Sequence, residues 1–139
     1  MRLTQGMFSF LPDLTDEQIA AQLQYCIDRG WAVDIEYTDD PHPRNTYWEL
    51  WGQPQFDLAS TDGLMVDLTR CRAEHPGIYI RISAFDSTKG WESVRASFIV
   101  QRPLEEPGFF LSRTYGPGRS VTYALRSYAT DRPQGLRYP

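Results

Sequence analysis

The sequence predicts an α+β fold in which a four-stranded, mainly antiparallel sheet carries two helices on one face. Two segments have apolar residues at helical spacing, and four have apolar residues at alternate positions. Their order along the chain is α-β-β-α-β-β, and a β-hairpin is expected after them. We therefore divide the 139 residues into a core domain, residues 1–102, and a C-terminal extension, residues 103–139.

Both helices have recognisable ends. Thr15 and Gln18 have the spacing of a capping box, and Gly30 ends the first helix. The second helix is expected to begin at residue 60 or 61 and to stop before Pro76. The apolar stripes are Ile19, Leu23, Cys26 and Ile27 in the first helix, and Leu64, Leu68 and Cys71, with His75 as an optional member, in the second.

The strands follow from alternation of apolar and polar residues. They are expected at residues 31–37, 47–51, 78–83 and 94–100, and the second strand is expected to end at Gly52 and Pro54. In the extension, residues 109–115 and 119–128 flank the turn Gly116-Pro117-Gly118. A lone two-stranded hairpin is marginal in water, so we expect another chain to cover its apolar residues.

Charge and composition exclude several classes of function. Residues 1–101 have a formal charge of −7 and residues 102–139 a charge of +3, so the body lacks the basic face of a general nucleic-acid-binding protein. A module that stacks single-stranded RNA on sheet aromatics remains the alternative. No signal peptide, transit peptide or membrane-length apolar run is recognisable. Cys26 and Cys71 lack metal-site spacing and are expected to be buried free thiols.

The sequence shows no combination of residues that would form a catalytic site. His42 and His75 are 33 positions apart, and no cysteine or carboxylate completes a metal-ligand set around either one. The adjacent acids at residues 39–40 and 105–106 fit solvated or interfacial positions better than an acid–base pair. Nucleophile-elbow, P-loop and dinucleotide motifs are missing from the sequence. We expect this chain to have no catalytic, metal-binding or cofactor-binding residues.

The most informative segment is residues 47–56, YWELWGQPQF, with two tryptophans, a tyrosine and a phenylalanine. Tryptophan and tyrosine are enriched where proteins bind one another, which favours an assembly subunit, although an aromatic core strand remains possible. Strand alternation places Tyr47, Glu49 and Trp51 on one face and Trp48 and Leu50 on the other. One of these two sets is therefore expected to belong to the core.

Three segments resemble the small subunit of ribulose-1,5-bisphosphate carboxylase/oxygenase (RuBisCO): residues 4–19 (TQGMFSFLPDLTDEQI), 35–56 and 98–109. The connection 38–46 is short, and a C-terminal extension begins at Pro103. Both features are similar to the red-type branch of the family, found in proteobacteria and non-green algae.

The resemblance implies a non-catalytic subunit in a complex of eight large and eight small chains. The large subunits would hold the active sites, the magnesium ion and the carbamylated lysine. The small subunits would cap the large-subunit octamer and support full carboxylase activity in CO₂ fixation by the Calvin cycle. Hairpins of neighbouring small subunits would meet around the central channel. The implied location is a bacterial cytoplasm, with a plastid stroma as the alternative and a carboxysome left open.

The resemblance also assigns interface residues in this chain. Those expected at the large-subunit interface are Arg44, Tyr47, Trp48, Glu49, Trp51, Pro54 and Phe56. Those expected to contact neighbouring small subunits are Phe109, Phe110, Arg113, Tyr115, Arg119 and Tyr123.

Overall fold

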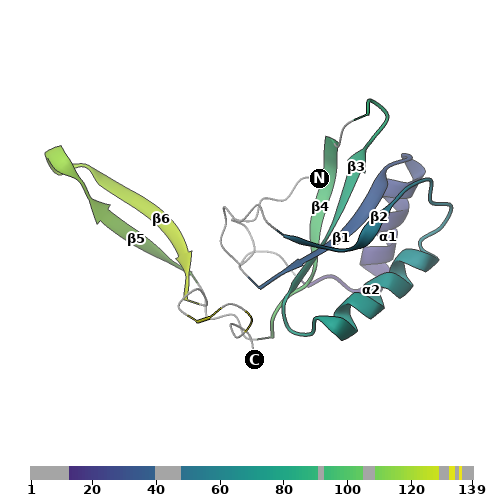
Figure 1. Ribbon diagram of the computed structural model, residues 1–139, viewed down its shortest axis with the longest axis horizontal. Coiled ribbons are helices and arrows are strands. Elements are labelled where there is room, and N and C mark those ends of the chain that lie inside the picture. Colours follow the sequence, from purple (N-terminus) through teal and green to yellow (C-terminus); the bar gives the residue numbers. More distant parts are fainter. Residues whose placement is uncertain are drawn as a thin grey trace.

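The computed structural model describes residues 13–39, 48–90, 93–104, 109–128, 132, 133 and 135. The elements appear in the order predicted from the sequence, and Figure 1 shows the hairpin strands β5 and β6 apart from the main sheet. The helices and strands are α1 (Asp16–Asp28), β1 (Ala32–Thr38), β2 (Glu49–Gln55), α2 (Asp62–Glu74), β3 (Tyr79–Asp86), β4 (Ser93–Gln101), β5 (Phe109–Tyr115) and β6 (Val121–Ser127).

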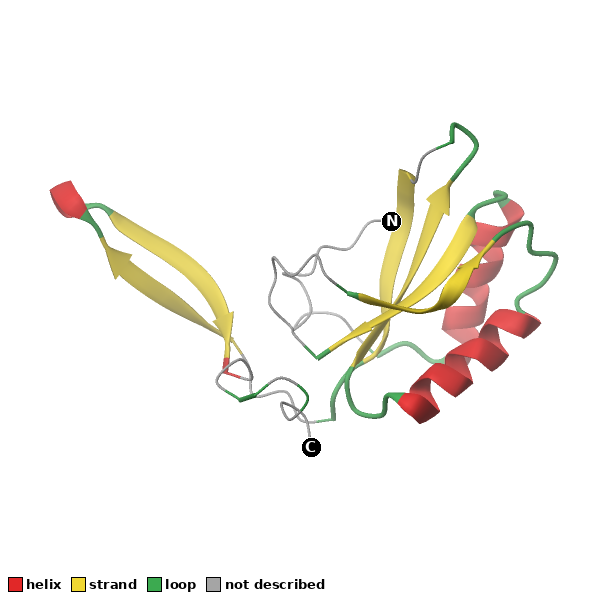
Figure 2. Ribbon diagram, in the orientation of Figure 1, coloured by secondary structure: helices red, strands yellow, loops and turns green. Residues whose placement is uncertain are grey.

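The main sheet has the strand order β2-β1-β3-β4, and every neighbouring pair is antiparallel. Both helices lie on the same side of this sheet, as Figure 2 shows, which confirms the predicted fold class. We call this side the helix face and the opposite side the open face. β2 and β4 are the edge strands, and β5 and β6 form a separate two-stranded sheet.

The core lies between the helices and the sheet. Each helix contributes the stripe that its sequence predicts, and the inward positions of β1, β3 and β4 complete the cluster. Its buried members are Ile19, Leu23, Cys26, Val33, Ile35, Leu64, Leu68, Cys71, Ile80, Ile82, Ala84, Ala96, Phe98 and Val100. Cys26 and Cys71 are free and buried, as predicted, and burial raises the pKa of the Cys71 thiol to about 11.

The helix ends follow the sequence signals in part. The Gln18 backbone N–H donates to the Thr15 hydroxyl at 3.2 Å, and the Thr15 N–H donates to Gln18 Oε1 at 2.9 Å, which completes the predicted capping box. α2 begins after Thr61 without a side-chain cap. His75 forms the C-cap of α2, and its ring stacks on that of Tyr37 at 3.8 Å between centroids.

The predicted end of the second strand is wrong, because β2 continues through Gly52 and Pro54 to Gln55. Gly52 has a φ of 70°, which allows the strand to bulge instead of ending. Between the pairs Ile35↔Trp51 and Val33↔Gln55, β1 advances two residues while β2 advances four. Proline is tolerated here because β2 is an edge strand.

The hairpin turn is also longer than predicted. β6 begins at Val121 rather than at residue 119, because the turn continues through Arg119 and Ser120. Gly118 and Arg119 both adopt positive φ angles, 68° and 64°, which a strand residue cannot have.

Candidate subunit interface

The residues of β2 divide between the two faces of the sheet. Leu50 lies opposite Glu36, which in turn lies opposite Arg81, so these three residues share the open face. Trp51 lies opposite Ile35, a core residue, and therefore belongs to the helix face. One side of the aromatic segment therefore faces the helices and the core, and the other side faces away from them.

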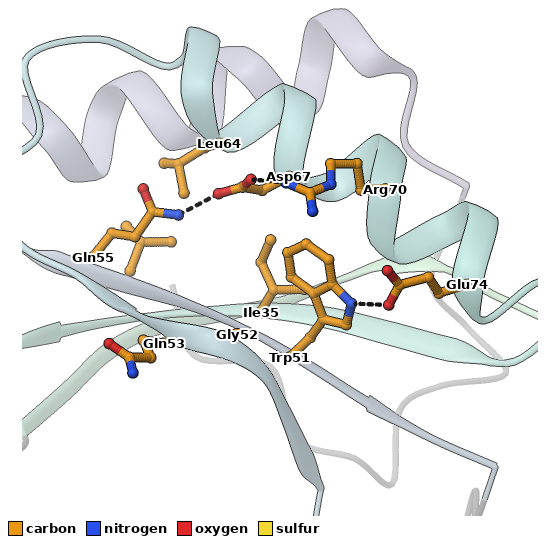
Figure 3. A pocket seen from close by; sticks show the side chains of 10 residues that line it. Ile35, Trp51, Gly52, Gln53, Gln55, Leu64, Asp67, Arg70 and Glu74 are labelled. Carbon is orange, nitrogen blue, oxygen red and sulfur yellow. Dashed lines mark hydrogen bonds and ion pairs between the residues drawn. The ribbon is translucent and has the colours of Figure 1, made fainter.

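On the helix face, Trp51 connects the edge strand to α2. Its indole N–H donates to Glu74 Oε2 at 2.7 Å, and four residues along β2 the Gln55 amide donates to Asp67 Oδ2 at 2.5 Å. Arg70 lies between these two hydrogen bonds, with its guanidinium carbon 5.8 Å from the centre of the Trp51 ring. Figure 3 shows these side chains around a groove of about 430 Å³. The polar rim and the buried floor suit a strand-to-helix contact more than a ligand site.

Glu49 takes part in a second contact on the helix face. The Tyr37 hydroxyl donates to the Glu49 carboxylate, and this hydrogen bond, reinforced by burial, raises the pKa of Tyr37. The His75 ring stacks on the Tyr37 ring, so His75 packs against a strand residue. His42 lies outside the described residues.

On the open face, Arg81 is held between two partners. Its guanidinium forms an ion pair with Glu36 and lies 4.3 Å from the centre of the Trp48 ring. Both charged side chains are largely buried, and a planar guanidinium can stack on an indole while it pairs with a carboxylate. Arg81 thus contacts Trp48, the residue just before β2.

Two large apolar side chains of the β2 segment remain exposed, Leu50 two positions after Trp48 and Phe56 at the other end of the segment. Leu50 is 46% exposed, and Phe56, which meets Phe85 edge-on at 5.8 Å, is 53% exposed. We call Trp48, Leu50 and Phe56 the open-face patch. Leu50 was not among the predicted interface residues, although alternation already placed it on the same face as Trp48.

The other residues predicted at this interface fall into three groups. Arg44 and Tyr47 lie outside the described residues. Glu49 and Trp51 contact groups of the helix face, as described above. Pro54 is half-buried in the bulge. Contact with a large subunit therefore stays a prediction for all of them.

The hairpin has one apolar face. Residues directly opposite each other in the β5–β6 ladder share a face, and the exposed ones on this face, which we call the hairpin apolar face, are Leu111, Arg113, Tyr115, Val121 and Tyr123. Phe110 lies on the other face, with its ring 4.6 Å from that of Tyr128, and Arg119 is in the turn. For Phe109 the structure gives only its backbone pairing with Ser127. Contacts with neighbouring chains stay predictions for the six hairpin residues.

The remaining candidate groups form no chemical site. Within residues 13–39, 48–90 and the later described segments, no three histidine, cysteine or acidic side chains lie together as metal ligands would. Asp39 accepts a hydrogen bond from the Gly135 N–H at 2.5 Å, whereas residues 40, 105 and 106 are not described. None of the helices in the described part is long and apolar enough to cross a bilayer.

The RNA-stacking alternative requires exposed aromatic rings on the open face. Tyr79 and Phe85 lie on this face near the two ends of the central strand β3, but both are buried, at 1% and 5% exposure. Trp48 already stacks with Arg81. The described part of the open face therefore offers no row of free rings on which successive bases could stack.

Comparison with known proteins agrees with the resemblance seen in the sequence. The family profile "Ribulose bisphosphate carboxylase, small chain" matches residues 5–103. The small subunit from Xanthobacter flavus is 63% identical over 131 residues, covering 93% of this chain and 98% of that protein. The red-algal small subunit from Antithamnion sp. is 58% identical, covering 99% and 100%. The solved structure of RuBisCO from Galdieria partita contains a chain with a TM-score of 0.86 and 48% identity, covering 99% and 100%. This chain therefore belongs to the family of ribulose bisphosphate carboxylase small chains.

Proposed function

We propose that this chain is the non-catalytic small subunit of a red-type RuBisCO and that it caps and stabilises an octamer of large subunits. The observation that carries this proposal is the open-face patch of Trp48, Leu50 and Phe56 on a chain of this family. Exposed large apolar side chains along a strand that also carries a tryptophan are typical of a surface that another protein covers. In this proposal the complex contains eight large and eight small chains.

The large subunit would bind against the open-face patch. Pro54, in the bulge, would extend the same contact, and Arg44 and Tyr47, which lie outside the described residues, would contact the large subunit nearby. Glu49 and Trp51 would support it from behind, because their side chains engage the helix face.

The hairpin apolar face would bind neighbouring small subunits. Tyr115 is 75% exposed and Leu111 is 64% exposed, and both lie on a two-stranded sheet that pairs with no strand of the core. An isolated hairpin of this kind gains stability when a second surface covers its apolar side. Residues 109–128 contain three arginines and no acidic residue, so an acidic or apolar surface would suit it best.

The chemistry of carboxylation would belong to the large subunit. The described residues of this chain bring together no ligand set that fits a magnesium ion, and we assign the metal and the carbamylated lysine to the large chain. The contribution of this chain would be indirect: it would hold large-subunit elements in one packing and so favour the active geometry. Its relatives come from bacteria and red algae, and we propose a bacterial cytoplasm as the compartment.

Reconstitution tests this proposal directly. The large subunit is produced alone and together with this chain, and CO₂-dependent turnover of ribulose bisphosphate is measured in both preparations. We expect turnover and thermal stability to rise when this chain is added, in proportion to the amount that binds. Equal turnover and equal stability with and without bound small chain would contradict the proposal.

A further inference from the structure

The backbone holds β2 in place only weakly. As an edge strand it pairs with β1 alone, and the bulge between Trp51 and Gln55 interrupts that pairing. Within the bulge, Pro54 has no N–H to donate. The open-face patch is carried by this strand and by its two flanking residues, so its position needs support from side chains.

That support comes from α2, at both ends of the bulge. Trp51, before the bulge, donates to Glu74, and Gln55, after it, donates to Asp67. Asp67 and Glu74 are seven residues apart, which is two helical turns or about 10 Å along one side of α2. The helix therefore presents two acceptors at a spacing that spans the bulged part of the strand.

Arg70 completes the arrangement between the two acids. Its guanidinium lies 4.0 Å from Asp67 Oδ1 and 5.8 Å from the centre of the Trp51 ring. Its positive charge offsets part of the repulsion between the two carboxylates, each of which accepts a hydrogen bond from a neutral donor of β2. Figure 3 shows Asp67 and Glu74 directed toward β2, with the Arg70 guanidinium turned toward Asp67 above the Trp51 ring.

We propose that Asp67 and Glu74 are positioning residues, which hold β2 in the orientation that the large subunit recognises without contacting that subunit themselves. Side chains alternate along a strand, so a rotation of β2 that releases Trp51 from α2 also moves Leu50 on the open face. Asp67 and Glu74 would therefore affect binding of the large subunit only through the orientation of β2. This inference rests on the proposed function, because it assumes that the open-face patch is the docking surface.

Variants of Glu74 test the inference. In Glu74→Ala the acceptor is lost, whereas in Glu74→Gln the side-chain oxygen can still accept the indole N–H. Asp67→Ala and Asp67→Asn form the matching pair at the other end. Glu17→Ala, on the exposed side of α1, is the control for charge. Each full-length variant competes with an equal amount of wild-type chain for a limiting quantity of large-subunit octamer, and mass spectrometry gives the incorporated ratio.

We expect each alanine variant to be incorporated about three- to tenfold less than the wild type, in keeping with the size of couplings transmitted through packed elements. The Gln and Asn variants should recover most of this loss, and Glu17→Ala should compete equally. Hydrogen exchange on the assembled alanine variants should be faster in β2 and unchanged in β3. Faster exchange in both strands would indicate a general loss of stability and would overturn a positioning role.

Two further outcomes separate this inference from the proposed docking surface. If Leu50→Ser competes poorly but Glu74→Ala competes equally with the wild type, the docking surface holds and the positioning role is wrong. If neither variant changes the ratio, the open-face patch is not the docking surface, and the inference fails with it.

Discussion

Replacing the two exposed apolar residues of the open-face patch with serine should weaken assembly with little effect on folding. Leu50 is 46% exposed and Phe56 is 53% exposed in the free chain, so about half of each side chain is available for burial on docking. Full burial of such a side chain contributes about 1.5–3 kcal/mol, and half of it therefore about 1 kcal/mol. The double variant should lose about 2 kcal/mol of binding free energy, which is roughly a 30-fold loss in affinity.

Competition for a limiting amount of large-subunit octamer measures this loss. Val66→Ser is the matched control, because Val66 is 59% exposed but lies on α2, away from the open face. The control should be incorporated as well as the wild type, and the double variant should be nearly absent from the complex. Incorporation of the double variant at the level of the Val66→Ser control would refute the assignment of the interface to the open face.

Three other predictions concern the hairpin, the core and a thiol. A chain cut after Arg102 should keep the circular dichroism of the folded core but assemble poorly, and a truncated chain that gives a full complex of unchanged melting temperature would contradict this. Leu68→Ala should lower the free energy of unfolding by about 3 kcal/mol in urea titrations, because the leucine is fully buried, whereas a loss below about 1 kcal/mol would mean that the site collapses around the cavity. Burial raises the pKa of the Cys71 thiol from an ordinary value of 9.0 to about 11. The stability that the fold gains by keeping this thiol protonated is fully present below pH 9 and is lost as the pH rises through about 11. Alkylation of Cys71 at pH 8.5 should be slow in the folded chain and fast in urea, and equal rates would contradict its burial.

Much of the fold could be predicted because its signals are local. The capping box at Thr15 depends on four consecutive residues, and the buried cysteines depend on the periodicity of two helices. The hairpin was predicted from two apolar runs around a glycine-proline turn. The bounds of its turn were missed because Arg119 adopts a positive φ, which non-glycine residues rarely do.

The course of β2 could not be predicted because it depends on tertiary structure. Gly52 and Pro54 read as strand terminators, and only the edge position of β2 explains why the strand continues past both of them. Alternation divided the aromatic segment into two faces but could not say which face the helices cover. The hydrogen bond from Trp51 to Glu74 answers this for the isolated chain, and it depends on a residue 23 positions away.

The native mass of the particle that contains this chain, purified untagged together with its partners, tests the central claim most directly. We predict one large particle in which this chain and a RuBisCO large subunit are present in equal numbers, eight of each. A monomer, or an oligomer made of this chain alone, would contradict the account.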